Sequence, residues 1–145
     1  MSAEDLFGLA SAAVLPGWLI LMLAPRGKWR WLDRIPALVI PFGLSALYTG
    51  LILAHFSAAG GGFGSIAQVR ALFASDWGLL AGWVHYLAFD LMIGALMATQ
   101  MDRVGLARIS QAPLLALIFL FGPLGVFLIW AAQGALRMMG KGDAA

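Results

Sequence analysis

Four long apolar segments dominate the pattern of hydrophobic and polar positions along the chain. They cover about residues 6–24, 35–56, 77–101 and 113–136, and polar or glycine-rich loops separate them. Each segment is long enough to cross a bilayer, which takes about 20 apolar residues in a helix. The pattern predicts an all-α polytopic membrane protein with a bundle of four transmembrane helices. Because the sequence has no internal repeat and no linker, we expect residues 1–145 to form this single domain.

Composition assigns the chain as a whole to the membrane class. Hydrophobic residues make up 62% of it and charged residues 11%, against about 45–50% and 25% in soluble domains. The absence of cysteine excludes disulfides, thiolate metal sites and cysteine nucleophiles. The net charge of +2 comes from a few loop residues, so it indicates membrane topology and not a nucleic-acid-binding surface.

The basic residues near the helix ends predict the orientation of the chain. The first and third loops hold six of them and the other side holds three, so the positive-inside rule places both termini outside the cytoplasm. The first segment begins with Glu4 and Asp5 and no basic residue, which predicts an uncleaved helix and not a signal peptide. The Ala- and Gly-rich sequence without a transit peptide indicates a bacterial inner (cytoplasmic) membrane. The six residues are Arg26, Lys28, Arg30, Arg34, Arg103 and Arg108, and the three are Arg70, Arg137 and Lys141.

The glycine-rich second loop contains one amphipathic stretch. In SIAQVRALFAS, residues 65–75, an apolar stripe of Ile66, Val69, Leu72 and Phe73 excludes Arg70. Two forms are open for this stretch: a short interfacial helix lying over the mouth of the bundle, or an ordered loop.

The third apolar segment carries polar side chains on one face. At 100° per residue, His85 and Asp90 are about 140° apart around the helix and about 7.5 Å apart along it. The arc between them also holds Tyr86 and Gln100. We expect this arc to face the protein interior. The opposite, apolar arc is expected to face lipid; it holds Leu80, Ala81, Val84, Leu87, Ala88, Leu91, Met92, Gly94, Ala95 and Ala98.

The second segment gathers its polar residues on one side as well. Ser45, Tyr48, Thr49 and His55 fall within about 120° of each other, so we expect them to meet the polar arc of the third helix and form a pocket. The first and fourth segments each place Pro beside Gly in mid-membrane, in VLPGW and FGPLG. Such a kink either frees a carbonyl toward a cavity or improves helix packing, and both interpretations are open.

Asp90 also has two interpretations. An ionised carboxylate at the bilayer centre costs at least about 2.5 kcal/mol, and the four segments contain no Lys or Arg to pair with it. We therefore expect Asp90 to be largely protonated and hydrogen-bonded to Tyr86 or to a hydroxyl of the second helix. It then serves either as a proton donor to a ligand or as a hydrogen-bonded link between helices. His85 has the same two interpretations, whereas His55, near its helix end, is expected to be an interfacial hydrogen-bonding residue.

Two motifs suggest a family. The segment GWVHYLAFDLMIG, residues 82–94, followed by FLFGPLGVFLIW, residues 119–130, resembles the small four-span proteins of the abscisic-acid-deficient-four-like family. The most specific part is the spacing of His85 and Asp90, and the Gly-Pro-Leu-Gly of residues 122–125 is second. Plant members are required for making neoxanthin. After Asp90 this chain runs LMIGALMATQ, without the arginine expected soon after the glycine, so the resemblance supplies no charge partner for Asp90.

The resemblance implies an intramembrane enzyme of carotenoid or related isoprenoid metabolism, which in plants isomerises an epoxy-carotenoid to an allenic one. Such a reaction uses an acid for the epoxide oxygen and a base for a neighbouring carbon, and it needs no cofactor and no metal. Asp90 is the expected acid and His85 the expected base. The residues expected to bind the lipophilic substrate are Ser45, Tyr48, Thr49, His55, Trp83, Tyr86 and Phe89.

Two other functions stay open. His55 and His85 could ligate a haem, but their depths in the membrane differ by about 10 Å, which disfavours it. The chain could also be a non-catalytic carotenoid- or lipid-binding subunit of a membrane complex. The expected partners are a carotenoid or isoprenoid and membrane lipids, and a homo-oligomer also stays open.

Overall fold

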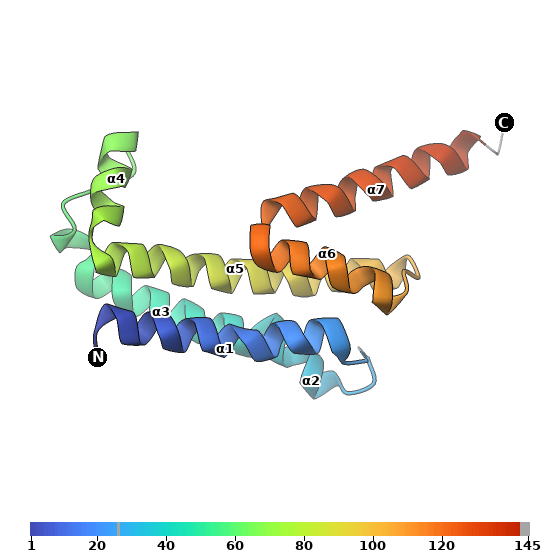
Figure 1. The fold of residues 1–145 in the computed structure, drawn as a ribbon, viewed down its shortest axis with the longest axis horizontal. Coiled ribbons are helices and arrows are strands. Elements are labelled where there is room, and N and C mark those ends of the chain that lie inside the picture. The colour runs from blue at the N-terminus through green and yellow to red at the C-terminus, as the bar shows by residue number, and fades with distance from the viewer. Residues whose placement is uncertain (26, 143–145) are drawn as a thin grey trace.

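Helices make up the framework of the protein (Figure 1). The computed structural model describes residues 1–25 and 27–142, and these ranges contain no strand. The all-α fold class is therefore confirmed. In chain order the elements are α1 (Ala3–Leu23), α2 (Arg30–Arg34), the π-helical turn η1 (Ile35–Val39), α3 (Ile40–His55), the 3-10 turn η2 (Phe56–Ala58), α4 (Ile66–Ala74), α5 (Asp76–Arg103), α6 (Arg108–Phe121) and α7 (Pro123–Gly142).

Three helical runs are long and apolar enough to cross a membrane. They are α1, the run Arg30–Ala58 that contains α3, and α5, and they overlap the first three predicted spans. These runs pack side by side, with α3 antiparallel to α1 and α5 (Figure 1). α1 begins with a capping box, in which the Ser2 hydroxyl accepts the Asp5 N–H at 3.1 Å and the Asp5 carboxylate accepts the Ser2 N–H at 2.8 Å.

The buried face of α5 is its apolar face, so the helical phase expected from polarity was wrong. Val84 and Leu91 have no exposed surface. A Cβ built at Gly94 would lie 2.6 Å from Cη2 of Trp18 in α1, which shows how closely the two helices approach. Small residues permit this close approach. Lipid tails are as apolar as these side chains, so helices associate in a membrane through close van der Waals packing and not through the hydrophobic effect. Apart from Met92, the arc expected to face lipid is buried: Leu80, Ala81, Val84, Leu87, Ala88, Leu91, Gly94, Ala95 and Ala98.

The Pro-Gly pair of the first span lies inside a continuous helix. α1 runs through Pro16 without ending, and Gly17 is buried against α5. A Cβ at Gly17 would lie 2.7 Å from Cδ2 of Leu91. The pair therefore serves packing, which is one of the two interpretations open from the sequence.

The fourth apolar segment forms two helices and not one. Gly122 has a φ of 39°, a conformation that favours glycine, and it separates the end of α6 from the start of α7. Pro123 follows, and its missing N–H is tolerated at the first position of a helix. Residues 113–136 therefore do not form the single span that the apolar pattern predicted. Figure 1 shows α7 diverging from the other helices after this turn.

α4 stands at the end of the bundle where α3 ends and α5 begins, roughly perpendicular to α5 and pointing away from α1 (Figure 1). Ser65 caps its first turn by accepting the Gln68 N–H at 3.2 Å. Its buried side chain is Leu72, and the backbone around Leu72 leaves no room for a side chain at Gly61 or Gly78. The amphipathic stretch of the second loop is thus a helix and not an ordered loop, but it does not lie over the mouth of the bundle (Figure 1).

Polar contacts join the loops at the opposite end of the bundle. The Arg108 guanidinium donates to the Ala24 carbonyl, which links the start of α6 to the end of α1. The Gln111 amide donates to Asp102 Oδ1 at 2.9 Å and to the Leu106 carbonyl at 2.6 Å. These contacts fix the start of α6 beside the ends of α1 and α5. We call this the basic end of the bundle, because residues 27–34, which include α2, and the loop between α5 and α6 lie there.

Candidate functional site

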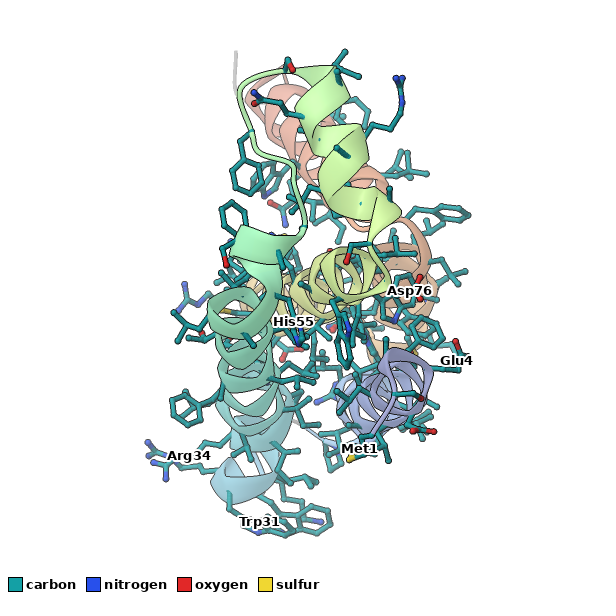
Figure 2. All side chains as sticks on the ribbon, turned by 90° about the vertical axis from the view of Figure 1, so that its left-hand side faces the viewer. Met1, Glu4, Trp31, Arg34, His55 and Asp76 are labelled. Carbon is teal, nitrogen blue, oxygen red and sulfur yellow. The ribbon has the colours of Figure 1, made fainter. Side chains whose placement is uncertain are left out.

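A cavity of about 240 Å³ opens at the α4 end of the bundle, between α3, α4 and α5. Phe56, Phe63, Phe73 and Trp77 give it aromatic walls, and three polar side chains reach it, namely Tyr48, His55 and His85. Figure 2 views the molecule from this end and shows His55 between α3 and α5. Aromatic walls with few polar groups are typical of sites for apolar ligands.

The three polar side chains lie at two levels of the cavity. His55, at the end of α3, stacks on Trp77 with ring centroids 4.3 Å apart and an interplanar angle of 3°. Tyr48 comes seven residues earlier, so it lies about 10 Å deeper at 1.5 Å per residue. There its ring centroid is 5.5 Å from that of His85. The cavity therefore has an outer level with His55 and, further along the bundle, a level with half-buried Tyr48 and exposed His85, which we call the deep level.

The polar groups of the cavity are left available to a ligand. Among the residues whose side chains the structure describes, none forms a hydrogen bond with the Tyr48 hydroxyl or with the imidazole of His55 or His85. His85 stacks on Phe89 of its own helix with centroids 4.6 Å apart, which orients its ring. A polar group of an apolar ligand that entered the deep level would find a hydroxyl donor and an imidazole acceptor there.

Asp90 faces a different part of the structure. It lies midway along α5 and is 8% exposed, and a Cβ built at Gly122 would lie 2.7 Å from its Oδ1. Its Oδ2 has no hydrogen-bond partner among the described residues. The nearby Tyr86 hydroxyl donates to the Phe119 carbonyl at 3.3 Å. The carboxyl group is thus enclosed by α5 and the α6–α7 turn.

The predicted acid and the predicted base are therefore not brought together. His85 lies at the cavity beside Tyr48 of α3, whereas Asp90 lies against Gly122, on the α6 side of α5. The spacing of five residues already places them about 140° apart around the helix. A small end group in the cavity cannot reach both.

The residues predicted to bind substrate lie in three places. Tyr48 and His55 line the cavity, and Phe89 stacks on His85 at its edge. Trp83 and Tyr86 line a separate cleft between α1 and α5. Ser45 and Thr49 are exposed on α3, where the Thr49 hydroxyl donates to the Ser45 carbonyl at 2.8 Å, so neither hydroxyl reaches the cavity.

Sequence reasoning missed the aromatic residues that close the cavity. Phe56 and Phe63 come from the chain between α3 and α4, and Phe73 comes from α4. A weak signal existed, because Phe56 and Phe63 flank a glycine-rich loop and Phe73 lies on the apolar stripe of residues 65–75. Their convergence depends on how α4 folds back, which no local pattern specifies.

A known protein family matches most of the chain. The sequence model of the ABA DEFICIENT 4-like family matches residues 5–129, a range that includes the cavity, Asp90 and the α6–α7 turn. No curated protein and no solved structure matches the chain. The family match agrees with the resemblance carried by residues 82–94 and 119–130. The chain therefore belongs to the ABA DEFICIENT 4-like family, and this membership suggests a carotenoid-related role.

Proposed function

We propose that the protein is an intramembrane enzyme that isomerises the end group of a carotenoid or related polyene isoprenoid by acid–base chemistry. The observation that carries this proposal is the aromatic cavity. Its deep level holds Tyr48 and His85, and neither side chain forms a hydrogen bond with the described residues. Membership of the ABA DEFICIENT 4-like family supplies the substrate class.

The size of the cavity supports an end group as its occupant. At about 240 Å³, it falls below the roughly 300–1,000 Å³ of sites that enclose a whole drug-sized ligand. A ring with its substituents fits such a volume, while a long polyene chain does not. The chain of the substrate then lies outside the cavity.

The positions of the polar groups support His85 as the base and Tyr48, in place of Asp90, as the acid. For an epoxide end group, the His85 imidazole takes a proton from the neighbouring polyene carbon, and the electrons of that C–H bond form a new double bond. The C–O bond breaks, and the oxygen takes the Tyr48 phenolic proton to become a hydroxyl. The proton then passes from the imidazolium back to the phenolate, so no atom is gained or lost. Such proton transfers contribute about 10²–10⁴-fold each.

Asp90 has a structural role in this proposal. Its carboxyl group is enclosed by the turn at Gly122 and is therefore placed to hold α6 and α7 against α5. Its Oδ2 has no hydrogen-bond partner among the described residues, so this role rests on close packing of the carboxyl group against the turn.

A non-catalytic carotenoid- or lipid-binding subunit is the second candidate. The outer face of α7 favours it, because Phe127 and Trp130 are 65% and 57% exposed and are free to contact another membrane chain, including a second copy of this one. Such a subunit would keep the cavity but would not need the Tyr48–His85 pair.

We place the protein in the cytoplasmic membrane, with its basic end toward the cytoplasm and its N-terminus on the other side. α1, α3 and α5 support this placement as spans, and the loops with Lys28, Arg30, Arg34, Arg103 and Arg108 lie together at the basic end.

Pigment chromatography in a bacterial host that makes epoxy-carotenoids tests the proposed function. Cells producing the wild-type chain should accumulate a new carotenoid isomer of unchanged mass, and cells producing His85→Gln at the same membrane level should not. Unchanged pigments with wild-type protein, together with carotenoid bound to the purified protein, would favour the binding subunit. A haem absorption band in the purified protein would overturn both.

A further inference from the structure

A second hollow lies next to the cavity. This lateral cleft of about 760 Å³ runs between the N-terminal part of α1 and the first turns of α5. Its walls are largely apolar and aromatic, with Phe7, Leu79, Trp83 and Tyr86 among them. The proposed reaction uses none of these side chains.

Phe73 separates the cleft from the cavity. Phe73 and Gly82 line both hollows. The ring of Phe73 rests on Gly82, because a Cβ built there would lie 2.5 Å from Cε1 of Phe73. Glycine at this position lets the ring lie directly on the α5 backbone. The Phe73 side chain therefore covers α5 at the place where the two hollows adjoin.

The walls of the cleft present flat aromatic faces. The Trp83 indole is fixed by a hydrogen bond of 2.9 Å from its Nε1–H to the Ser11 hydroxyl. It stacks on Tyr86 with centroids 5.4 Å apart, and Phe7 packs against it at 5.4 Å. A planar conjugated chain packs well against such faces.

Charge at the cleft disfavours a phospholipid as its occupant. Glu4 and Asp76 line it at the α4 end of the bundle, where Figure 2 shows both. Two carboxylates repel the phosphate of an anionic lipid, whereas they exert no such repulsion on an uncharged isoprenoid.

Resting on the function proposed above, we propose that this cleft is the subsite for the conjugated chain of the substrate. The ring of Phe73 turns off Gly82 when substrate enters, and the chain passes over Gly82 from the cavity into the cleft. The end group occupies the cavity, and Trp83 and Tyr86 hold the chain.

Two ligands and two variants test this subsite. The ligands are a full-length epoxy-carotenoid and a short analogue, the same ring epoxide ending after its first double bond. Binding to the purified protein in nanodiscs is followed by competition with a radiolabelled short analogue. Leu79→Trp fills the cleft from an exposed position, and Leu53→Trp, on the exposed face of α3, is the matched control.

We expect Leu79→Trp to weaken binding of the full-length carotenoid about tenfold and to leave the short analogue unchanged, while Leu53→Trp changes neither. Equal affinity of Leu79→Trp and wild type for the full-length carotenoid would overturn the chain subsite alone. Equal weakening of both ligands would overturn it too. Failure of the wild-type protein to bind either molecule would overturn the proposed function together with this subsite.

A second inference concerns α6 and α7 and rests on different observations. α6 has 14 residues, about 21 Å of helix at 1.5 Å per residue, which is short of the roughly 30 Å hydrocarbon core. It starts at the basic end, where Arg108 donates to the Ala24 carbonyl, and it ends at Gly122 against Asp90, midway along α5. α6 therefore enters the bundle only to mid-depth.

α7 returns to the end from which α6 came. Ile118 and Gly125 pack together across the turn, where a Cβ at Gly125 would lie 2.5 Å from Cγ1 of Ile118. Figure 1 shows α7 running back from the turn, so that it ends on the side of the basic end, away from the N-terminus. Gly122 itself is buried against Asp90, whereas Phe121 and Pro123 on either side of it are exposed.

The distribution of charge agrees with this path. With a single fourth span, the basic residues divide six against three. With α7 returning, Arg137 and Lys141 join the basic end, which then holds eight of the nine and leaves Arg70 alone on the other side. The positive-inside rule is satisfied far better by the second division. We infer that α6 and α7 form a re-entrant hairpin and that α7 ends on the cytoplasmic side.

Labelling of single cysteines tests this topology in the naturally cysteine-free chain. An impermeant maleimide on intact spheroplasts should label Ser2→Cys and Ser57→Cys. It should label Gly27→Cys and Gly142→Cys only after the membrane is permeabilised. Labelling of Gly142→Cys in intact spheroplasts, alongside Ser2→Cys, would overturn the hairpin and restore a full fourth span.

Discussion

Gly122 lies directly against the carboxyl group of Asp90: a Cβ built on Gly122 would be 2.7 Å from Oδ1 and 2.9 Å from Oδ2. The two residues are 32 positions apart in the sequence, yet the turn between α6 and α7 and the middle of α5 depend on each other. The glycine of the Gly-Pro-Leu-Gly motif supplies both the positive φ and the space.

Gly122→Ala should destabilise the protein by about 1–3 kcal/mol, because the methyl group collides with the carboxyl group and the backbone conformation disfavours a Cβ. Thermal unfolding in detergent measures the effect. Gly8→Ala in α1 is the matched control, since nothing lies within 4 Å of a Cβ there, and it should be neutral or slightly stabilising. Equal melting temperatures for the two variants would contradict the close approach.

Asp90→Asn should retain most of the product-forming activity, because asparagine keeps the size and the hydrogen-bonding capacity of a neutral carboxyl group. Asp90→Leu, by contrast, should lower the melting temperature, since the branched leucine side chain does not fit the close contact with Gly122. Product chromatography and thermal unfolding on the same preparations separate the two effects. A stable Asp90→Asn protein that forms no product would return the acid role to Asp90.

Tyr48→Phe should reduce product formation by about 10²–10⁴-fold and leave the fold intact, because it removes the proposed acid and keeps the aromatic ring. Initial rates of isomer formation in nanodiscs measure the loss. Thr49→Val is the matched control on the same helix, with its hydroxyl bonded to its own helix and outside the cavity. Similar rates for Tyr48→Phe and wild type would remove Tyr48 from the reaction.

Gly94→Leu should prevent α1 from packing on α5, because Trp18 occupies the space above Gly94. Leu96→Ala, two residues along the same helix, should be tolerated because Leu96 is 55% exposed. Membrane yield and resistance to limited proteolysis compare the variants. Tolerance of leucine at Gly94 would contradict the buried face assigned to α5.

The three helical runs that are long enough to cross a membrane could be predicted, because each is a long apolar run in the sequence. The face of α5 that is buried could not be predicted from polarity. The polar residue His85 is exposed, whereas small residues such as Ala88 and Gly94 are buried where helices touch. Close packing of small residues was the better guide to the interior.

Gly122 and Pro123 mark a break in the fourth segment of the sequence. They do not predict that the segment forms two separate helices. A Gly-Pro pair in an apolar run predicts a kink of unknown angle, and the angle here is fixed by contacts with Ile118 and Asp90 that are remote or unpatterned in the sequence. The candidate site could be predicted only in part, because some of its residues come from loops. Tyr48, His55 and His85 were identified from helical faces, while Phe56, Phe63 and Phe73 reach the cavity through loop and surface-helix geometry.

The hairpin also bears on how the chain is inserted during synthesis. With this path, the segment between α3 and α5 has to be translocated, and it contains a single basic residue, Arg70. Everything after α5 stays on the side of the ribosome. Until α6 and α7 dock, Asp90 faces hydrocarbon uncovered, so a chain truncated after α5 would present a polar group at mid-membrane. Membrane proteases and insertion factors could recognise this group as the mark of an unfinished protein.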